Sequence, residues 1–126
     1  MIAYLDTNAV VRLAQGNTRY IGREVARLLE RAELLISPIV LLELELLYEI
    51  KRVKLPSRDI QRKVEAELGV RLCSIPFAEI ASASLDEKWT RDPFDRLIVA
   101  NAKANGFAWL ISADEKIAEN YPRTVW

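Results

Sequence analysis

Short apolar segments alternate with longer segments of helical periodicity along the whole chain. Apolar runs of strand length lie at residues 2–5, 34–37, 70–75, 109–112 and 124–126. Helical spacing of apolar positions predicts helices over residues 7–14, 21–32, 38–53, 57–69, 76–88, 93–106 and a short one from 114. Because the strands are continuously apolar and alternate with helices, the pattern predicts an α/β fold whose parallel sheet is covered on both faces.

Polar residues at the expected helix ends support these boundaries. Thr7 or Asn8 is placed to cap the first helix, because a short side chain with an oxygen accepts a hydrogen bond from the open backbone amides. Ser37 and Ser57 are placed in the same way at the start of two later helices. Gly106 is expected to end the sixth predicted helix, because a glycine readily takes the left-handed conformation found there.

The length and composition are those of one compact domain. The chain has 126 residues, 51% of them hydrophobic, with no repeat and no Gly/Ser linker, so a single domain over residues 1–126 is expected. No apolar run approaches the ~20 residues that a membrane-spanning helix needs. The first residues lack a basic flank ahead of a long apolar segment, so we expect no signal peptide and a cytoplasmic location.

Charge and rare residues restrict the chemistry further. The 18 basic and 18 acidic side chains cancel, which argues against a broad cationic surface for nucleic acid. The sequence has no His, which excludes Ser–His and Cys–His catalysis and histidine metal ligands. Its single cysteine, Cys73, excludes an internal disulfide and a cysteine-based zinc site. Any reaction must therefore rest on carboxylates, amines, hydroxyls or a hard cation.

Two acids are expected at one edge of the predicted sheet. Asp6 and Asp114 each come directly after a predicted strand. The carboxyl ends of parallel strands meet at one edge, which is where open α/β sheets bind their ligands. Both acids are also placed to cap the helix that follows, so each has a structural explanation beside the functional one.

Two further acids interrupt apolar helix faces. Glu43 falls on the apolar face of its helix, opposite Glu45 and Arg52, which are expected to face solvent. A carboxylate there is costly unless a salt bridge to a buried Arg, a capping role or a ligand compensates it. Asp95 lies on the apolar face of a later helix, in the first turn, where the helix dipole also favours an acid. Asp92, placed before a proline, is explained by capping alone.

The coincidence of the four acids Asp6, Glu43, Asp95 and Asp114 is more informative than any one of them. Several carboxylates cannot stay ionised close together without a counterion. Without His or a usable Cys, the natural counterion is a hard cation that prefers oxygen ligands, such as Mg²⁺ or Mn²⁺. Carboxylates that hold such an ion suit the hydrolysis of phosphodiesters.

Four segments of the sequence carry these acids in a recognisable order. They are Tyr4–Asn8, Ser37–Leu44, Trp89–Ala100 and Leu110–Asp114. Together they resemble the PIN domain, and more closely the VapC-type ribonuclease toxins of VapBC toxin–antitoxin systems. The resemblance covers nearly the whole chain. It implies a single PIN domain that folds as a three-layer α/β/α sandwich with a central parallel sheet.

The resemblance also implies an activity and partners. It implies an endoribonuclease dependent on Mg²⁺ or Mn²⁺, in which Asp6, Glu43, Asp95 and Asp114 are the catalytic and metal-binding acids. Asp95 is chosen because the family's third acid precedes an Ile-x-Ala helix segment, and Asp92 stays a candidate for a peripheral or water-mediated ligand. A homodimer is implied too, as is a small antitoxin whose C-terminal segment covers the site and places an Arg in the acidic pocket.

Polar and basic residues near the acids are expected to assist them. Thr7, Asn8 or Ser112 would orient an acid or contact an RNA phosphate. Some relatives carry Ser at the place of Asn8 and many carry Thr at the place of Ser112, so a polar group is kept at both. Arg12 and Arg96 lie nearest the expected edge and are the candidates for binding phosphate, although Arg96 could instead pair with a nearby acid.

Two other functions are compatible with the same pattern. A catalytically silent PIN-like module that binds RNA or protein would have the same fold, and only metal binding and activity would distinguish it. A solitary RNA-processing nuclease would share the acids and lack the antitoxin. The four acids together favour an enzyme over the silent module.

Overall fold

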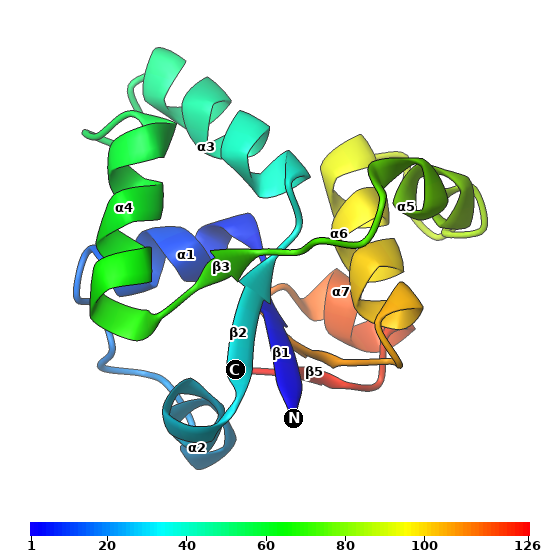
Figure 1. The fold of residues 1–126 in the computed structure, drawn as a ribbon, viewed down its shortest axis with the longest axis horizontal. Helices are drawn as coiled ribbons and strands as arrows, with labels where there is room; N and C mark the ends of the chain where they lie inside the picture. Colours follow the sequence, from blue (N-terminus) through cyan, green and yellow to red (C-terminus); the bar gives the residue numbers. More distant parts are fainter.

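A five-stranded, all-parallel sheet forms the centre of the protein, whose computed structural model describes residues 1–126. The strand order is β3-β2-β1-β4-β5. The strands are β1 (Ile2–Leu5), β2 (Glu33–Ile36), β3 (Arg71–Leu72), β4 (Trp109–Ile111) and β5 (Thr124–Val125). The sequence therefore predicted all five strands and their parallel arrangement, which places every carboxyl end at one edge (Figure 1).

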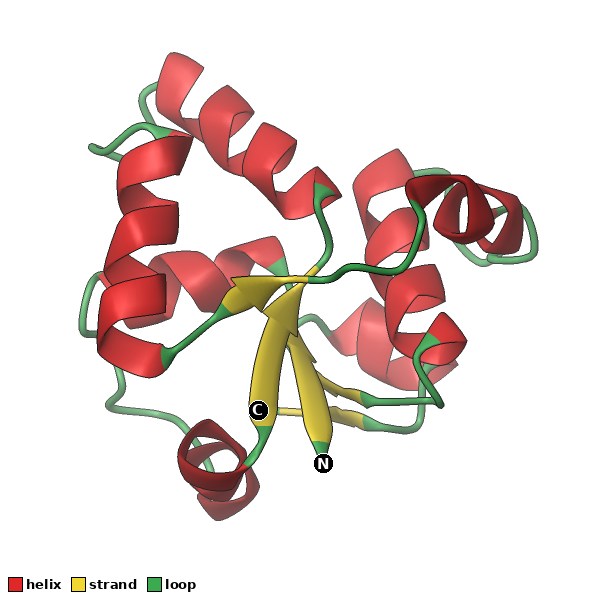
Figure 2. Ribbon diagram, viewed as in Figure 1, coloured by secondary structure: helices red, strands yellow, loops and turns green.

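Seven helices cover this sheet. They are α1 (Thr7–Ala14), α2 (Arg23–Arg31), α3 (Ile39–Glu49), α4 (Ser57–Leu68), α5 (Phe77–Ser84), α6 (Pro93–Ala104) and α7 (Glu115–Asn120). Figure 2 shows α1, α2 and α4 on one side of the sheet and α5, α6 and α7 on the other. Helix α3 contacts α1, α4 and α6 beyond the carboxyl ends of the strands. The predicted α/β/α sandwich is confirmed.

The core fills the spaces between the sheet and its helices. Strand side chains such as Leu5, Ile36 and Leu110 are almost fully buried and pack in one cluster with helix residues such as Leu28 and Ile98. Burying a side chain of this kind stabilises the fold by about 1.5–3 kcal/mol relative to leaving it in water. None of the helices is long and apolar enough to cross a membrane.

Two helices end earlier than their apolar spacing predicts. Helix α3 ends at Glu49 rather than near residue 53, because Lys51 takes a left-handed φ of 64° and Arg52 turns back to donate to the carbonyl of Leu47. Helix α5 ends at Ser84 rather than near residue 88, since the backbone then tightens into a series of i to i+3 turns. Apolar periodicity continues across such turns, so it cannot locate them.

The helix caps also differ in part from the prediction. Asp6, not Thr7 or Asn8, caps α1. Ser37 was expected to cap α3, but its buried hydroxyl makes no hydrogen bond. Ser57 is the first residue of α4 rather than its cap, and its hydroxyl donates to the Leu41 carbonyl of α3. These serines meet tertiary partners or apolar surroundings that the local sequence does not reveal. The prediction for residue 106 is confirmed, because this glycine has a φ of 68° just after α6.

Candidate active site

The carboxyl edge of the sheet brings the predicted acids into one neighbourhood. Asp6 follows β1 and Asp114 lies just beyond β4, the strand next to β1. Glu43 comes from α3 and Asp95 from the first turn of α6. The negative charges of the other three acids each raise the pKa of Asp95, so all three lie within electrostatic reach of Asp95. The four acids that the sequence singled out thus lie around one edge of the sheet.

Asp6 is the most deeply buried of these acids, with 5% of its surface exposed. Its Oδ1 accepts a hydrogen bond of 2.8 Å from the Ala9 amide, and its Oδ2 accepts one from the Ser112 hydroxyl. Burial raises the pKa of Asp6 to about 6, although these two hydrogen bonds act in the opposite direction. The carboxylate is therefore held in one orientation, and a nearby cation would favour its charged form.

Glu43 is held by a hydroxyl from another element. The Thr7 side chain, at the start of α1, donates a hydrogen bond to Oε1 of Glu43. Burial raises the pKa of Glu43, and the charges of Asp92 and Asp6 add to this effect. Glu43 makes neither a salt bridge nor a helix cap, the two structural explanations that its position on the apolar face allowed. Its carboxylate is thus positioned but has no cationic partner.

Glu45 corrects the expected orientation of α3. It was predicted to face solvent with Arg52, but it is half-buried and its Oε1 accepts a hydrogen bond of 3.0 Å from the Ser57 amide. Glu45 therefore supports the first turn of α4, which is the role that had been considered for Glu43. The exposed side of α3 carries Glu49, as predicted, and also apolar side chains, with Leu42 52% and Leu46 40% exposed.

Asp92 and Asp95 share the start of α6 but differ in surroundings. Asp92 is exposed and caps the helix, since its Oδ1 accepts hydrogen bonds from the amides of Phe94 at 2.8 Å and Asp95 at 3.3 Å. Asp95 is half-buried, and its carboxylate takes part in no hydrogen bond within the protein. Burial, followed by the charges of Asp92, Asp114, Glu43 and Asp6, raises the pKa of Asp95 to about 7.

Ser112 connects two of the acids. Its hydroxyl donates to Asp6 and accepts a hydrogen bond of 3.1 Å from the backbone amide of Asp114. The Asp114 side chain caps α7 by accepting a bond of 3.1 Å from the Ile117 amide. The capping roles considered for Asp6 and Asp114 are therefore real, and each still leaves acceptor capacity on the carboxylate.

The donor chemistry of this neighbourhood fits a hard divalent cation. All the candidate ligands are carboxylate oxygens, the type that Mg²⁺ and Mn²⁺ prefer. The four ion pairs of the protein involve none of these acids, so no basic side chain pairs with them directly. No three of the acids lie close enough together to enclose one ion in this structure. These acids therefore match a hard divalent cation in the type of donor atom and in charge.

The remaining candidate residues lie around these acids in different settings. Asn8 is exposed in the first turn of α1. Arg96 does not pair with Asp92, because its Nε donates at 2.7 Å to the Thr90 carbonyl. Arg12 is exposed, forms no ion pair, and stacks its guanidinium on the ring of Trp126 at 5.1 Å. Sequence reasoning did not single out Trp126, since nothing in its local pattern distinguishes it from any apolar strand residue.

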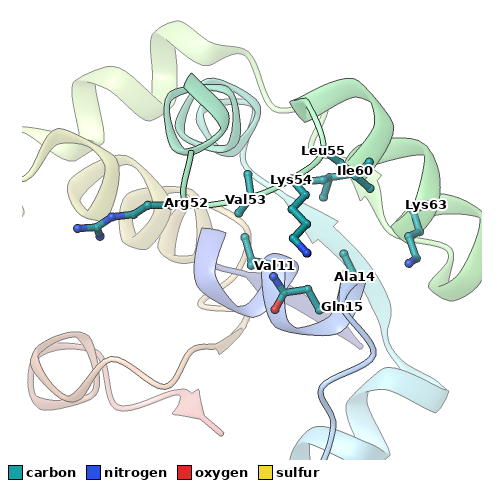
Figure 3. A pocket seen from close by; sticks show the side chains of 9 residues that line it. All are labelled: Val11, Ala14, Gln15, Arg52, Val53, Lys54, Leu55, Ile60 and Lys63. Atoms are coloured by element: carbon teal, nitrogen blue, oxygen red, sulfur yellow. The ribbon is translucent and has the colours of Figure 1, made fainter. Parts of the chain in front are cut away.

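A separate pocket lies between α1 and the loop that joins α3 to α4 (Figure 3). It has a volume of about 490 Å³. Val11, Val53 and Ile60 contribute to its apolar lining. Arg52, Lys54 and Lys63 are the charged residues that line it, and no acid does. The pocket is thus apolar within and positively charged at its border, unlike the acidic edge of the sheet.

Comparison with known proteins agrees with this architecture. The sequence pattern of the PIN domain matches residues 3–121, which is most of the chain. The chain belongs to the PIN domain family. None of the curated proteins matches this PIN domain in sequence.

Solved structures with the same fold as this PIN domain cover nearly its whole length. VapBC-1 from nontypeable Haemophilus influenzae has a TM-score of 0.66 and 23% identity, covering 100% of this chain and 96% of that one. A toxin–antitoxin complex from Klebsiella pneumoniae has a TM-score of 0.64 and 25% identity, with coverages of 98% and 96%. VapBC2 from Rickettsia felis, bound to a DNA fragment from its promoter, has a TM-score of 0.61 and 23% identity, with coverages of 99% and 96%.

Proposed function

We propose that this PIN domain is a metal-dependent endoribonuclease and the toxin of a toxin–antitoxin pair. The observation that carries the proposal is the gathering of Asp6, Glu43, Asp95 and Asp114 at the carboxyl edge, with raised pKa values where burial is deepest and no basic partner. PIN domains are generally nucleases, which agrees with this arrangement. An acidic site repels a polyanion such as RNA unless a cation is bound there.

Each acid has a role in this proposal. Asp6 and Asp95 would hold the principal Mg²⁺ or Mn²⁺, directly or through water, while Glu43 would help to hold it or position the attacking water. Asp114 would complete a second, weaker ion site. A bound divalent cation supplies a water of lowered pKa and offsets the charge of the attacked phosphate. Thr7 and Ser112 keep Glu43 and Asp6 in place through their hydroxyl hydrogen bonds.

The hydrolysis needs nothing from the chain beyond these oxygen groups. The attacking water forms a bond to phosphorus, the bond to the leaving ribose oxygen breaks, and a proton reaches that oxygen. Burial raises the pKa of Glu43, which suits it to accept a proton from the water that it would position. The absence of His, which removes the commonest proton carrier, is therefore no obstacle.

The partner proposal rests on the comparisons and on the pocket beside α1. Structures of toxin–antitoxin complexes share the fold, one of them at 25% identity. The pocket suits a segment of a small antitoxin that carries both apolar and acidic side chains, because apolar residues line it and its charged residues are all basic. An antitoxin segment that continues from this pocket toward the acids would place an Arg among them, as a charge-assisted partner.

A homodimer is also part of the proposal. The exposed apolar side chains of Leu42 and Leu46 on α3, and of Ile50 just after it, support a homodimer, since a second copy would remove them from water. The oligomeric state is measured by light scattering after gel filtration, with Leu46→Glu expected to shift the protein to the monomer. A wild-type monomer at micromolar concentration would contradict this part alone.

The decisive experiment is RNA cleavage with Mg²⁺, with Mn²⁺ or with EDTA, comparing the wild type with Asp95→Asn. We expect cleavage with either metal, none with EDTA, and none by the variant. Asp86→Asn, which changes an exposed acid outside the site, is the matched control and should cleave normally. Cleavage that persists in EDTA and in Asp95→Asn would overturn the proposed mechanism. RNA binding without cleavage would instead indicate a silent binding module.

A further inference from the structure

Arg12 is a cation beside the acidic site that has no carboxylate partner. It lies on α1, which begins at the residue after Asp6, and its guanidinium stacks on the Trp126 ring at 5.1 Å. None of the four ion pairs of the protein includes Arg12, and it forms no side-chain hydrogen bond. A guanidinium that lies over an aromatic ring keeps its N–H groups directed outward in its own plane, where they can donate to an anion.

Two separate sets of contacts link Arg12 to Asp6. The Asp6 carboxylate caps α1, the helix that carries Arg12. Asp6 also accepts a hydrogen bond from Ser112, whose backbone amide donates at 3.0 Å to the carbonyl of Val125. Trp126 follows Val125 directly in the sequence, and the Arg12 guanidinium lies over its ring. The cation is thus tied to the buried acid through two independent routes.

Trp126 is itself held in place. Its ring packs against the edge of the hydrophobic core. Its backbone lies close to Gly22, where an added Cβ would meet the Trp126 carbonyl oxygen at 3.0 Å. The positive charge of Arg12 lowers the pKa of Asp6 against the larger effect of burial, which agrees with the place that these contacts give the guanidinium. The exposed Arg12 side chain therefore lies against a ring that the core holds in place.

We propose that Arg12 binds a phosphate of the RNA substrate next to the acids, and that Trp126 is the positioning residue that orients its guanidinium. The inference rests on the proposed ribonuclease function and names how its substrate is held. A cation at this place attracts the polyanion that the carboxylates repel, and it does so at one phosphate rather than over a broad surface. The zero net charge of the chain is compatible with such a local contact.

A second Arg–Trp stack in the protein serves as a control for the Arg12–Trp126 stack. Arg123 lies over the ring of Trp109 at 4.7 Å, with the same two residue types and similar geometry. Trp109 begins β4 and Arg123 precedes β5, so this pair lies at the amino edge of the sheet, away from the acids. Substitutions in the second pair test whether loss of any stacked Arg affects RNA binding.

The test measures steady-state cleavage and equilibrium binding of a short single-stranded RNA by R12Q, W126L and W126F, with R123Q and W109F as controls. We expect R12Q to raise KM about tenfold with kcat changed less than about twofold, because one charge-assisted phosphate contact is lost. The slope of log binding constant against log salt should fall by about 0.7, the value for one contact to a single strand. Thermal melting of every variant checks that the fold is kept.

W126L should weaken RNA binding about threefold, whereas W126F, which keeps an aromatic face for the guanidinium, should recover most of this loss. R123Q and W109F should bind and cleave like the wild type. A merely structural stack predicts lower melting temperatures in both pairs with no change in KM or salt slope, and that result would overturn the inference. So would equal binding by R12Q and R123Q when the wild type cleaves RNA, with the proposed function left standing. A wild type that neither binds nor cleaves RNA would overturn both.

Discussion

Ser112 and Asp6 lie 106 positions apart in sequence, yet the Ser112 hydroxyl donates a hydrogen bond to Oδ2 of Asp6. The contact joins the ends of the neighbouring parallel strands β4 and β1. It opposes the effect of burial on the pKa of Asp6 and so favours the charged form. Since the proposed site needs Asp6 ionised to hold a cation, Ser112 is an essential support for it.

Removing this hydroxyl should therefore weaken the site without removing an acid. We expect Ser112→Ala to lower RNA cleavage about 10- to 100-fold near pH 6.5, because the pKa of Asp6 rises and its carboxylate loses its orientation. Part of the loss should disappear at higher pH, where Asp6 ionises without help. Ser112→Thr keeps the hydroxyl and should retain activity. The measurement is the pH–rate profile of the three proteins, and an unchanged profile for Ser112→Ala would contradict this role.

Asp6→Asn should abolish cleavage while leaving the fold intact. The amide keeps an oxygen that caps α1 through the Ala9 amide, but it cannot supply the charge that binds a cation. We expect cleavage to fall about a hundredfold or more, with a melting temperature equal to or above that of the wild type without metal. Burial already disfavours the charged form of Asp6, so a neutral side chain relieves that cost. Full activity of Asp6→Asn would remove Asp6 from the mechanism.

Asp92 and Asp95 should respond differently to the same substitution. Asn caps a helix about as well as Asp, so Asp92→Asn keeps α6 and removes only a peripheral charge. We expect its cleavage to fall less than about tenfold. Asp95→Asn should abolish cleavage, because its half-buried carboxylate carries the strongest influence of the other acids. Isothermal titration with Mn²⁺ provides a second measurement, and equal losses of metal affinity in the two variants would contradict the assignment.

Stability in the absence of metal should fall as the pH rises. Asp6 and Asp95 have folded-state pKa values raised from 3.8 to about 6 and about 7. Because the folded protein holds these protons more tightly than the unfolded chain, this contribution to stability is complete below pH 3.8 and is lost as the pH rises to about 7. We expect Asp95→Asn to flatten the fall in melting temperature between pH 5 and 7.5, measured in EDTA. An identical pH profile for wild type and variant would contradict the raised pKa of Asp95.

Mg²⁺ or Mn²⁺ should reverse this trend. A cation that binds the ionised acids stabilises the folded state by mass action, and its effect should increase with pH as protons leave the site. We expect the increase in melting temperature on adding Mn²⁺ to be larger at pH 7.5 than at pH 5.5. Asp86→Asn should behave like the wild type, while Asp6→Asn should lose the response. Stabilisation that is equal at both pH values would contradict binding at these carboxylates.

Local sequence features predicted most of the fold. The order of strands and helices follows from apolar periodicity, and Asp92, Asp114 and Gly106 lie at the helix ends for reasons contained in a few neighbouring residues. The end of α3 could not be predicted in this way. It depends on the left-handed conformation of Lys51, and lysine is not a residue type that predicts such a turn.

The sequence also singled out the four candidate acids, because strand ends and interrupted apolar faces can be recognised in the sequence alone. It did not reveal how they are held. Glu43 is supported by Thr7, and Glu45 rather than Glu43 supports α4, which depends on the rotation of α3 relative to its neighbours. Apolar spacing fixes that rotation only roughly, since α3 carries apolar residues on its exposed side as well.

The sequence by itself thus determined the α/β class, the order of the elements and the identity of the carboxylates, since these follow from short-range periodicity and from residue chemistry. Only the tertiary structure decided that Ser112 holds Asp6, that Thr7 holds Glu43 and that Arg12 stacks on Trp126. Each of these contacts joins segments distant in sequence through strand register and helix packing. The sequence around a hydroxyl or an aromatic ring does not indicate which distant residue it will contact. For this physical reason the candidate acids could be singled out from the sequence, whereas the residues that hold them in place could not.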